Sequence, residues 1–267
     1  MTSLERVSVG GLNIVYRRVG EGPVALFLHG GLTDHRAWEP QLELADELTV
    51  VAWDAPGCGG SDDPPAWFGM DDYAAVLAEF VDAVSLGRPH VVGLSFGATL
   101  GLALAGHAPS LPRTLVLVSP YAGWAGSLAP ETVAERLEAG LRALDRGPDA
   151  LAETFLETLF GSGADPQLVA RTSAMLEDVR PAGARTMLRA IADCDLRDAL
   201  ARVDTPTLVV HGTEDVRAPE PVARAIHEAI PGSTFVALPG VGHECNLEAP
   251  AAFNTALRGF LRRADGG

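Results

Sequence analysis

The chain has 267 residues, of which 47% are hydrophobic, and it carries a formal net charge of −15. This length and apolar content are enough for one large α/β unit with a buried core. The negative charge argues against a nucleic-acid partner, because phosphate binding needs clustered Lys and Arg and the chain has no such run. An acidic surface mainly favours solubility, so the charge indicates no specific partner.

The sequence contains no signal for export or membrane insertion. Its first ten residues lack a basic region followed by an apolar stretch. Apolar runs such as Val24–Leu28 are far shorter than the ~20 residues that cross a bilayer. The cysteines are odd in number and too widely spaced for a disulfide framework or a zinc site: Cys58, Cys194 and Cys245. We therefore expect a cytoplasmic protein that needs no membrane and no metal.

The chain begins with a hairpin pattern and continues with buried strands. Leu4–Val9 and Leu12–Val19 alternate in polarity and are separated by two glycines, which predicts a β-hairpin. Later apolar runs are short and do not alternate, which is typical of parallel strands covered on both faces. These runs are Val24–Leu28, Leu48–Trp53, His90–Leu94, Thr114–Val118, Thr207–Val210 and Thr234–Leu238.

Helical patterns lie between these strands. Asp71–Leu86 repeats apolar residues at a helical period. Pro219–Ile230 and Pro250–Leu261 each begin with a proline, which suits the first helical turn. Residues 262–267 are expected to fray. Alternating strands and helices imply right-handed crossovers, so the predicted fold class is α/β with a mostly parallel, doubly covered central sheet.

This alternation stops between residues 121 and 200, where only helical patterns occur. Four helices are predicted there, at Pro130–Leu144, Asp149–Phe160, Pro166–Val179 and Ala182–Ala192. We therefore predict a helical insertion at residues 121–200. It divides an α/β core formed by residues 1–120 and 201–267.

The strongest chemical motif is Gly93-Leu94-Ser95-Phe96-Gly97, which follows a strand and precedes a helix rich in small residues. A sharp strand-to-helix turn of this kind holds a serine in strained geometry and exposes its hydroxyl above the sheet. Side chains at Gly93 and Gly97 would collide across the turn. Ser95 is therefore the candidate nucleophile, and an ordinary glycine-lined turn is the alternative.

Serine needs a base to take its proton, and that base needs an orienting carboxylate. His243 lies in a Gly-rich loop between the strand Thr234–Leu238 and the last helix. Asp215 follows the strand Thr207–Val210, and we prefer it to the adjacent Glu214, which is expected to be a solvated charge. The chain order Ser95, Asp215, His243 is the one that accompanies this type of turn.

A fourth motif, His29-Gly30-Gly31-Leu32, ends the strand Val24–Leu28. Backbone N–H groups there, together with that of Phe96, can stabilise a tetrahedral oxyanion. We assign the donors to Gly31 and Phe96, with Leu32 as the alternative to Gly31. His29 is expected to hold the loop rather than to act as a second base.

Together these motifs resemble the α/β-hydrolase fold superfamily, specifically its cap-bearing esterase, lactonase and enol-lactonase-like members. The resemblance is carried by His29–Gly31, Asp54–Ser61, Gly93–Gly97, Gly212–Asp215 and Gly240–His243, and it covers nearly the whole chain. It implies that Asp54–Ser61 is a structural turn. It also implies that residues 121–200 form a cap that roofs the pocket and sets substrate choice.

Two differences from motifs found elsewhere in the superfamily narrow the expected activity. Ser95 stands where epoxide hydrolases and haloalkane dehalogenases are expected to have aspartate, which disfavours those activities. The oxyanion loop lacks the Gly-Pro-Gly of carbon–carbon bond hydrolases and the proline-containing continuation of cofactor-free haloperoxidases.

The resulting hypothesis is a serine hydrolase that cleaves an ester, lactone or thioester of a small, largely apolar molecule through an acyl-enzyme. No metal or organic cofactor is implied, and the oligomeric state stays open. We expect the substrate to contact Leu32, Trp67, Trp124 and Phe155, with Phe96 beside them. The alternative is a non-hydrolytic member of the same fold, either a ligand receptor or a cofactor-free elimination or cyclisation catalyst.

Overall fold

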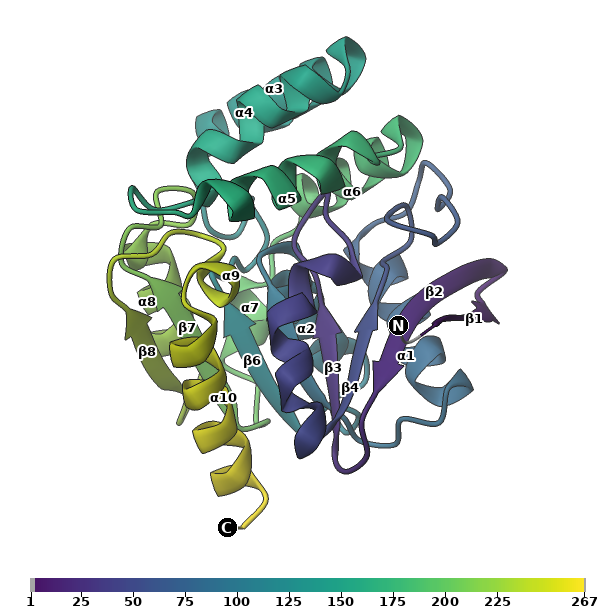
Figure 1. Cartoon of the computed structure of the whole chain (residues 1–267), viewed down its shortest axis with the longest axis vertical. Coiled ribbons are helices and arrows are strands. Elements are labelled where there is room, and N and C mark those ends of the chain that lie inside the picture. Colours follow the sequence, from purple (N-terminus) through teal and green to yellow (C-terminus); the bar gives the residue numbers. More distant parts are fainter. Residues whose placement is uncertain (1–2, 267) are drawn as a thin grey trace.

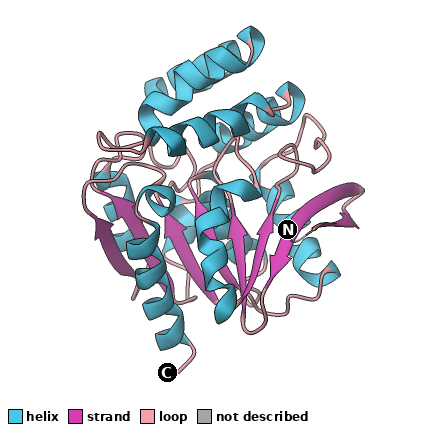
Figure 2. Ribbon diagram, viewed as in Figure 1, coloured by secondary structure: helices cyan, strands magenta, loops and turns pink. Residues whose placement is uncertain are grey.

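The computed structural model describes residues 3–266, which form one eight-stranded sheet flanked by helices (Figure 2). The strand order is β1-β2-β4-β3-β5-β6-β7-β8. β1 and β2 pair antiparallel, β2 also pairs antiparallel with β4, and every other pair is parallel. The strands are β1 (Leu4–Val9), β2 (Leu12–Val19), β3 (Val24–Leu28), β4 (Thr49–Trp53), β5 (His90–Leu94), β6 (Thr114–Val118), β7 (Thr207–Gly212) and β8 (Thr234–Leu238). The predicted fold class is confirmed.

Helices cover both faces of this sheet, as the continuous apolar strands require (Figure 1). Alternate strand residues point to opposite faces, so Leu26 and Leu28 join one apolar cluster while Phe27 joins the other. The first cluster is completed by α1 (Met70–Ala83), α2 (Phe96–His107) and α8 (Glu220–Ala229). The second is completed by the 3₁₀ helix η1 (His35–Asp46) and by α10 (Pro250–Ala264).

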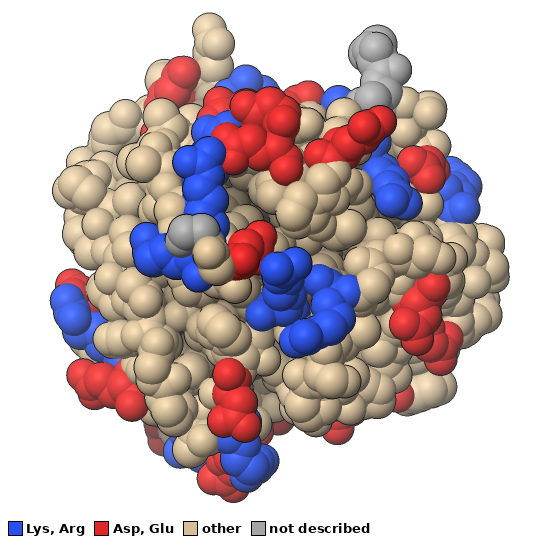
Figure 3. All heavy atoms as spheres, turned by 90° about the horizontal axis from the view of Figure 1, so that it is seen from below, with Lys and Arg blue, Asp and Glu red and all other residues tan. Residues whose placement is uncertain are grey.

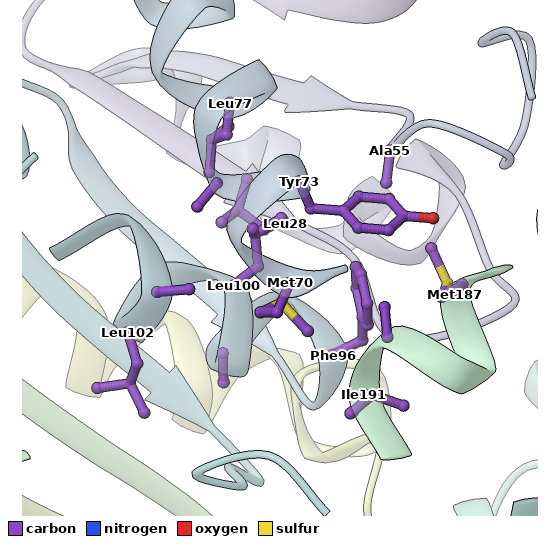
Figure 4. Close-up of a cluster of buried hydrophobic side chains, with 14 of the residues drawn as sticks. Leu28, Ala55, Met70, Tyr73, Leu77, Phe96, Leu100, Leu102, Met187 and Ile191 are labelled. Carbon is purple, nitrogen blue, oxygen red and sulfur yellow. The ribbon is translucent and has the colours of Figure 1, made fainter. Parts of the chain in front are cut away.

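Four further helices form a layer beyond the carboxyl ends of the strands (Figure 1). They are α3 (Pro130–Arg146), α4 (Pro148–Leu159), α5 (Pro166–Glu177) and α6 (Pro181–Asp193). Each begins with a proline, whose missing N–H costs nothing in a first helical turn. In Figure 4, Met187 and Ile191 of α6 lie beside Phe96 at the start of α2.

The structure contains short elements that the sequence pattern did not predict. Among residues 3–266 these are η1, α7 (Arg197–Leu200) and α9 (Cys245–Glu248). Each is too short, or in η1 too interrupted by Pro40, to show a helical period. The expectation that the chain frays from residue 262 was wrong for the described residues. α10 continues to Ala264, and Asp265 pairs with Arg113 at 2.8 Å. Met1, Thr2 and Gly267 lie outside the described residues.

The surface carries charges of both signs. On the face opposite α3–α6, arginines and acidic residues are interspersed over the surface (Figure 3). Among the described residues, no helix is both long enough and apolar enough to span a bilayer.

Backbone packs tightly against backbone where β5 turns into α2. A Cβ on Gly93 would lie 2.2 Å from the carbonyl oxygen of Gly97, and a Cβ on Gly97 would lie 2.1 Å from that of Leu28. These obstacles are backbone atoms, so no rotamer change can remove them. β3, β5 and α2 can therefore pack at this distance only if both positions are glycine.

We expect Gly97→Ala to destabilise the protein by more than about 3 kcal/mol, because the new methyl group meets backbone. The matched control is Gly106→Ala, in the same helix, where a Cβ would meet nothing within 4 Å. That change should stabilise by up to about 1 kcal/mol through helix propensity. Urea unfolding measures both, and equal effects of the two substitutions would refute the steric argument.

Candidate active site

Ser95 lies between β5 and α2 with φ +52° and ψ −107°, a left-handed conformation that non-glycine residues rarely adopt. Its backbone N–H donates to the carbonyl of Val118 at 2.9 Å, which extends the β5–β6 ladder to the turn. Its carbonyl accepts from the N–H of Thr99 at 3.0 Å, which begins α2. Ladder and helix together hold the strained residue, and the hydroxyl borders a cavity under α4–α6.

Asp215 follows β7 and contacts His243, which follows β8. The carboxylate Oδ2 of Asp215 lies 2.9 Å from Nδ1 of His243. Its Oδ1 accepts from the backbone N–H groups of Arg217 at 2.9 Å and Ala218 at 2.8 Å. Burial alone would raise the pKa of Asp215, but the charge and hydrogen bond of His243 and the N–H of Ala218 hold that pKa below its usual range. Asp215 is therefore a carboxylate suited to orient an imidazole.

The other ring nitrogen of His243 is available for chemistry. Its Nε2 is buried without a hydrogen-bond partner among residues 3–266, and His243 borders the same cavity as Ser95. The hydroxyl of Ser119 donates to the His243 carbonyl at 2.8 Å and fixes the loop. With Nδ1–H held by Asp215, Nε2 is a proton acceptor on the side of the ring away from that carboxylate.

Backbone donors border the same cavity. Gly31 and Leu32 line it, and within the described residues neither N–H donates to another protein group. Phe96 is the first residue of α2, so its N–H precedes the intrahelical bonds. Leu32 has φ +66°, which marks a tight turn in this loop. These N–H groups are therefore candidate donors to a ligand in the cavity.

Neighbouring polar residues have structural contacts. His29 Nδ1 lies 2.7 Å from the carbonyl of Gly30, and its Nε2 accepts from the N–H of Ala55 at 2.9 Å, so its ring joins two loops. Burial lowers the pKa of His29. Asp54 accepts from the N–H of Gly60 at 2.9 Å and closes the turn 54–61. Glu214 is exposed, as expected of a solvated charge, and its carboxylate also accepts hydrogen bonds from the N–H and hydroxyl of Ser162.

Within residues 3–266, the group of side chains closest to a cation-binding arrangement is Asp34, His35 and Asp54. Arg36 already pairs with Asp34 at 2.6 Å, and His35 Nδ1 lies 2.7 Å from Asp54. These contacts satisfy the carboxylates internally. The cluster therefore forms an ion-pair network next to the loop that follows β3.

Comparison with known proteins identifies the family. A family model described as "Alpha/beta hydrolase family" matches residues 25–256. The chain belongs to the alpha/beta hydrolase family. One relative in sequence and two in structure illustrate the range of this family.

The relative in sequence is the 2-(acetamidomethylene)succinate hydrolase of Mesorhizobium japonicum. It is 26% identical, and the match covers 96% of this chain and 94% of that protein.

Two solved structures superpose on nearly the whole chain. A thermophilic esterase from Thermogutta terrifontis, solved with malate bound, has a TM-score of 0.90 and 26% identity, covering 98% of this chain and 99% of that one. The enol-lactonase from Burkholderia xenovorans LB400 has a TM-score of 0.88 and 26% identity, covering 97% and 100%. These likenesses extend across both the sheet and the helices α3–α6.

The cavity beside Ser95 in this alpha/beta hydrolase, here called the inner cavity, is small and mainly apolar. Leu32, Phe96, Trp124 and Phe155 line it, as expected. Further apolar side chains come from α4, α5 and α6: Leu159, Leu176, Met187, Leu188 and Ile191. It offers about 30 Å³ to the centres of water-sized molecules, enough for roughly two waters. A molecule larger than this would therefore have to displace lining side chains.

The expectation that Trp67 lines this cavity was wrong. Its side chain is 71% exposed, packs against Phe68 with 5.1 Å between ring centroids, and borders a separate surface hollow near Asp71 and Arg189. The segment between the turn 54–61 and α1 places Trp67 at that hollow instead. An aromatic residue in a loop gives no sequence signal for its direction.

Sequence reasoning missed two polar residues of the inner cavity, Arg217 and Glu244. Arg217 lies two residues after Asp215, and Glu244 directly follows His243, so their proximity in sequence was the one available signal. Glu244 is 2% exposed, and its Oε2 has no hydrogen-bond partner among the described residues. Burial, reinforced by the charge of Glu248, raises the pKa of Glu244 to about 8. Glu244 is therefore an uncharged carboxylic acid at neutral pH.

This raised pKa predicts a pH-dependent effect of Glu244→Gln on stability. Between the ordinary pKa near 4.5 and about 8, the folded protein binds more protons at this site than the unfolded chain, so stability falls as pH rises. Glutamine does not titrate, so the variant does not lose this stability as the pH rises. We expect little gain at pH 4.5 and a gain on the order of 3 kcal/mol at pH 9.

Urea unfolding at the two pH values measures the effect. Glu228→Gln, at an exposed position of α8, should show no such pH dependence. The assignment of a neutral Glu244 is contradicted if Glu244→Gln gives the same change at both pH values.

Proposed function

We propose that this alpha/beta hydrolase cleaves a carboxylic ester or lactone of a small molecule, with Ser95 as nucleophile, His243 as base and Asp215 as its orienting carboxylate. The observation that carries the proposal is the 2.9 Å contact between His243 Nδ1 and Asp215. Two further observations support it: His243 and Ser95 line the same cavity, and Nε2 of His243 has no hydrogen-bond partner among the described residues. A serine at a strained turn, a base and a fixed acid form the set that acyl transfer requires.

The first half of the reaction forms an acyl-enzyme. The Ser95 oxygen attacks the substrate carbonyl carbon while Nε2 of His243 takes the hydroxyl proton. The carbonyl oxygen becomes an oxyanion, which accepts hydrogen bonds from the N–H groups of Gly31 and Phe96. The imidazolium then gives its proton to the leaving alkoxide as the carbon–oxygen bond breaks. Asp215 stabilises the imidazolium throughout without taking its proton.

The second half releases the acid. A water gives its proton to His243 Nε2 and attacks the acyl carbon, and the collapse of the second tetrahedral intermediate returns the proton to Ser95. An open-chain ester loses its alcohol in the first half. A lactone keeps the alcohol tethered to the acyl chain. The similar proteins include an esterase and an enol-lactonase, which supports both substrate classes.

Ser95→Ala tests the proposal. Because the nucleophile is lost, we expect turnover of short-chain esters or simple lactones to fall at least about 10³-fold. A fluorophosphonate probe should label the wild-type protein at Ser95 and should not label the variant.

Ser110→Ala, at an exposed loop position, is the matched control and should keep both turnover and labelling. If the folded wild-type protein resists the probe, or if Ser95→Ala retains turnover, a receptor or non-hydrolytic role replaces this proposal.

A further inference from the structure

We propose that the substrate carries an anionic group, such as a carboxylate, and that Arg217 and Arg136 form the subsite that binds it. This inference rests on the proposed function, because it names the class of substrate whose carbonyl would reach Ser95. It differs from the largely apolar substrate expected from the aromatic residues alone.

Arg217 is anchored between the core and α4. Its backbone N–H donates to Asp215, so its position follows that of the carboxylate. Its guanidinium lies 4.8 Å from the ring centroid of Phe155, and its Nη1 donates to the Thr158 hydroxyl at 3.0 Å. Both Arg217 and Phe155 line the inner cavity and also a second hollow of about 170 Å³, here called the outer hollow. This pair therefore separates the two spaces.

Arg136 comes from α3 and lines the outer hollow with Arg217. Its Nη1 donates to the hydroxyl oxygen of Tyr121 at 3.0 Å. That hydroxyl in turn donates to the backbone carbonyl of Arg217. The remaining lining of the outer hollow is aromatic, aliphatic or hydroxyl-bearing and includes Trp124, Thr154 and Val216, so no carboxylate borders it within the described residues.

The two arginines differ from the other partly buried arginines in the described part of the chain. Those others each pair with a carboxylate: Arg17, Arg36, Arg180, Arg185 and Arg258. Within residues 3–266, Arg136 and Arg217 have no carboxylate oxygen within 4.0 Å, although both are partly buried. A guanidinium cannot discard its charge at physiological pH. Partial burial of an uncompensated cation is costly unless an anion completes the site.

Two acids act electrostatically on Arg217, namely Asp215 and Glu244. Asp215 already binds His243 and two backbone N–H groups. Glu244 is uncharged at neutral pH, because burial and the charge of Glu248 raise its pKa to about 8. Neither acid therefore compensates Arg217 in the way that a directly bound carboxylate would. An uncharged Glu244 also leaves the inner cavity free of repulsion toward an anionic substrate.

The sizes of the two spaces suit such a substrate. The inner cavity is limited to about 30 Å³, whereas the outer hollow has about 170 Å³. A carbonyl at Ser95 would leave the rest of the molecule to extend past Phe155 toward the arginines. A planar carboxylate can accept two parallel hydrogen bonds from a guanidinium, a geometry that an ammonium group does not offer.

The test is a comparison of monomethyl glutarate, which is an anion, with dimethyl glutarate, which is neutral. Calorimetry with the Ser95→Ala protein measures binding without turnover. We expect the anion to bind at least about tenfold more tightly than the diester. Adding Arg217→Met should abolish this preference, and adding Arg136→Met should reduce it. Adding Arg217→Lys should restore part of it.

Arg202→Met removes an exposed arginine that precedes β7 and should leave the preference intact. Equal binding of the two ligands, or no binding of the anion, would overturn the proposal. So would an Arg217→Met protein in which both ligands weaken equally, because that result indicates a purely structural role for the side chain. Arg136→Met supplies the same comparison if Arg217→Met does not fold.

This outcome is separable from the hydrolase proposal. Binding to Ser95→Ala does not depend on catalysis, whereas turnover and fluorophosphonate labelling do. A preference for the anion without labelling of the wild-type protein would retain the subsite and remove the serine mechanism. Labelling of the wild-type protein without a preference for the anion would retain the serine mechanism and remove the subsite.

Discussion

The close approach of backbone to backbone at the β5–α2 turn determines the rest of the site. Gly97 can lie against the Leu28 carbonyl because it has no side chain, and this contact joins α2 to the end of β3. Ser95 takes a left-handed conformation at the same turn. The loop after β3 carries Gly31, so one steric constraint places the proposed nucleophile beside the proposed oxyanion donors. Strain at Ser95 is tolerated because a strand ladder and a helix hold it on either side.

A second glycine contact places the proposed base. A Cβ on Gly212 would lie 2.1 Å from the carbonyl oxygen of Gly242, so the loops after β7 and β8 are pressed together. The N–H of Glu214 donates to the Val241 carbonyl at 2.8 Å across the same contact. Asp215 and His243 follow directly in these two loops. Their side-chain contact is thus a consequence of backbone packing as well as of charge.

Sequence pattern predicted what depends on local backbone chemistry. Continuous apolar runs located the strands, and the glycine spacing around Ser95 indicated the turn, because those features need particular residues at particular positions. The direction in which a loop side chain points was not predictable. Trp67 turned out to be exposed, whereas Arg217 and Glu244 border the inner cavity. Closeness in sequence to Asp215 and His243 was the one signal for Arg217 and Glu244, and it does not say whether a side chain faces a cavity or water, since tertiary packing decides that.

The inner cavity combines an apolar lining with two polar side chains, one uncharged and one positively charged. Glu244 is kept neutral by burial, while Arg217 keeps its charge beside an aromatic ring. The proposed chemistry needs the first state, because an uncharged Glu244 places no negative charge near the oxyanion that would form at Ser95. The proposed subsite needs the second. Both depend on the helices α3–α6 excluding water from the carboxyl ends of the strands.

The most direct test of the account is a crystal structure of the protein after reaction with a fluorophosphonate. The account predicts a covalent bond from phosphorus to the Ser95 oxygen. It also predicts a phosphoryl oxygen about 2.7–3.1 Å from the N–H groups of Phe96 and of Gly31 or Leu32, with His243 Nε2 next to the modified oxygen. A phosphoryl oxygen that faces solvent, or a His243 ring turned away from the adduct, would contradict the proposed arrangement.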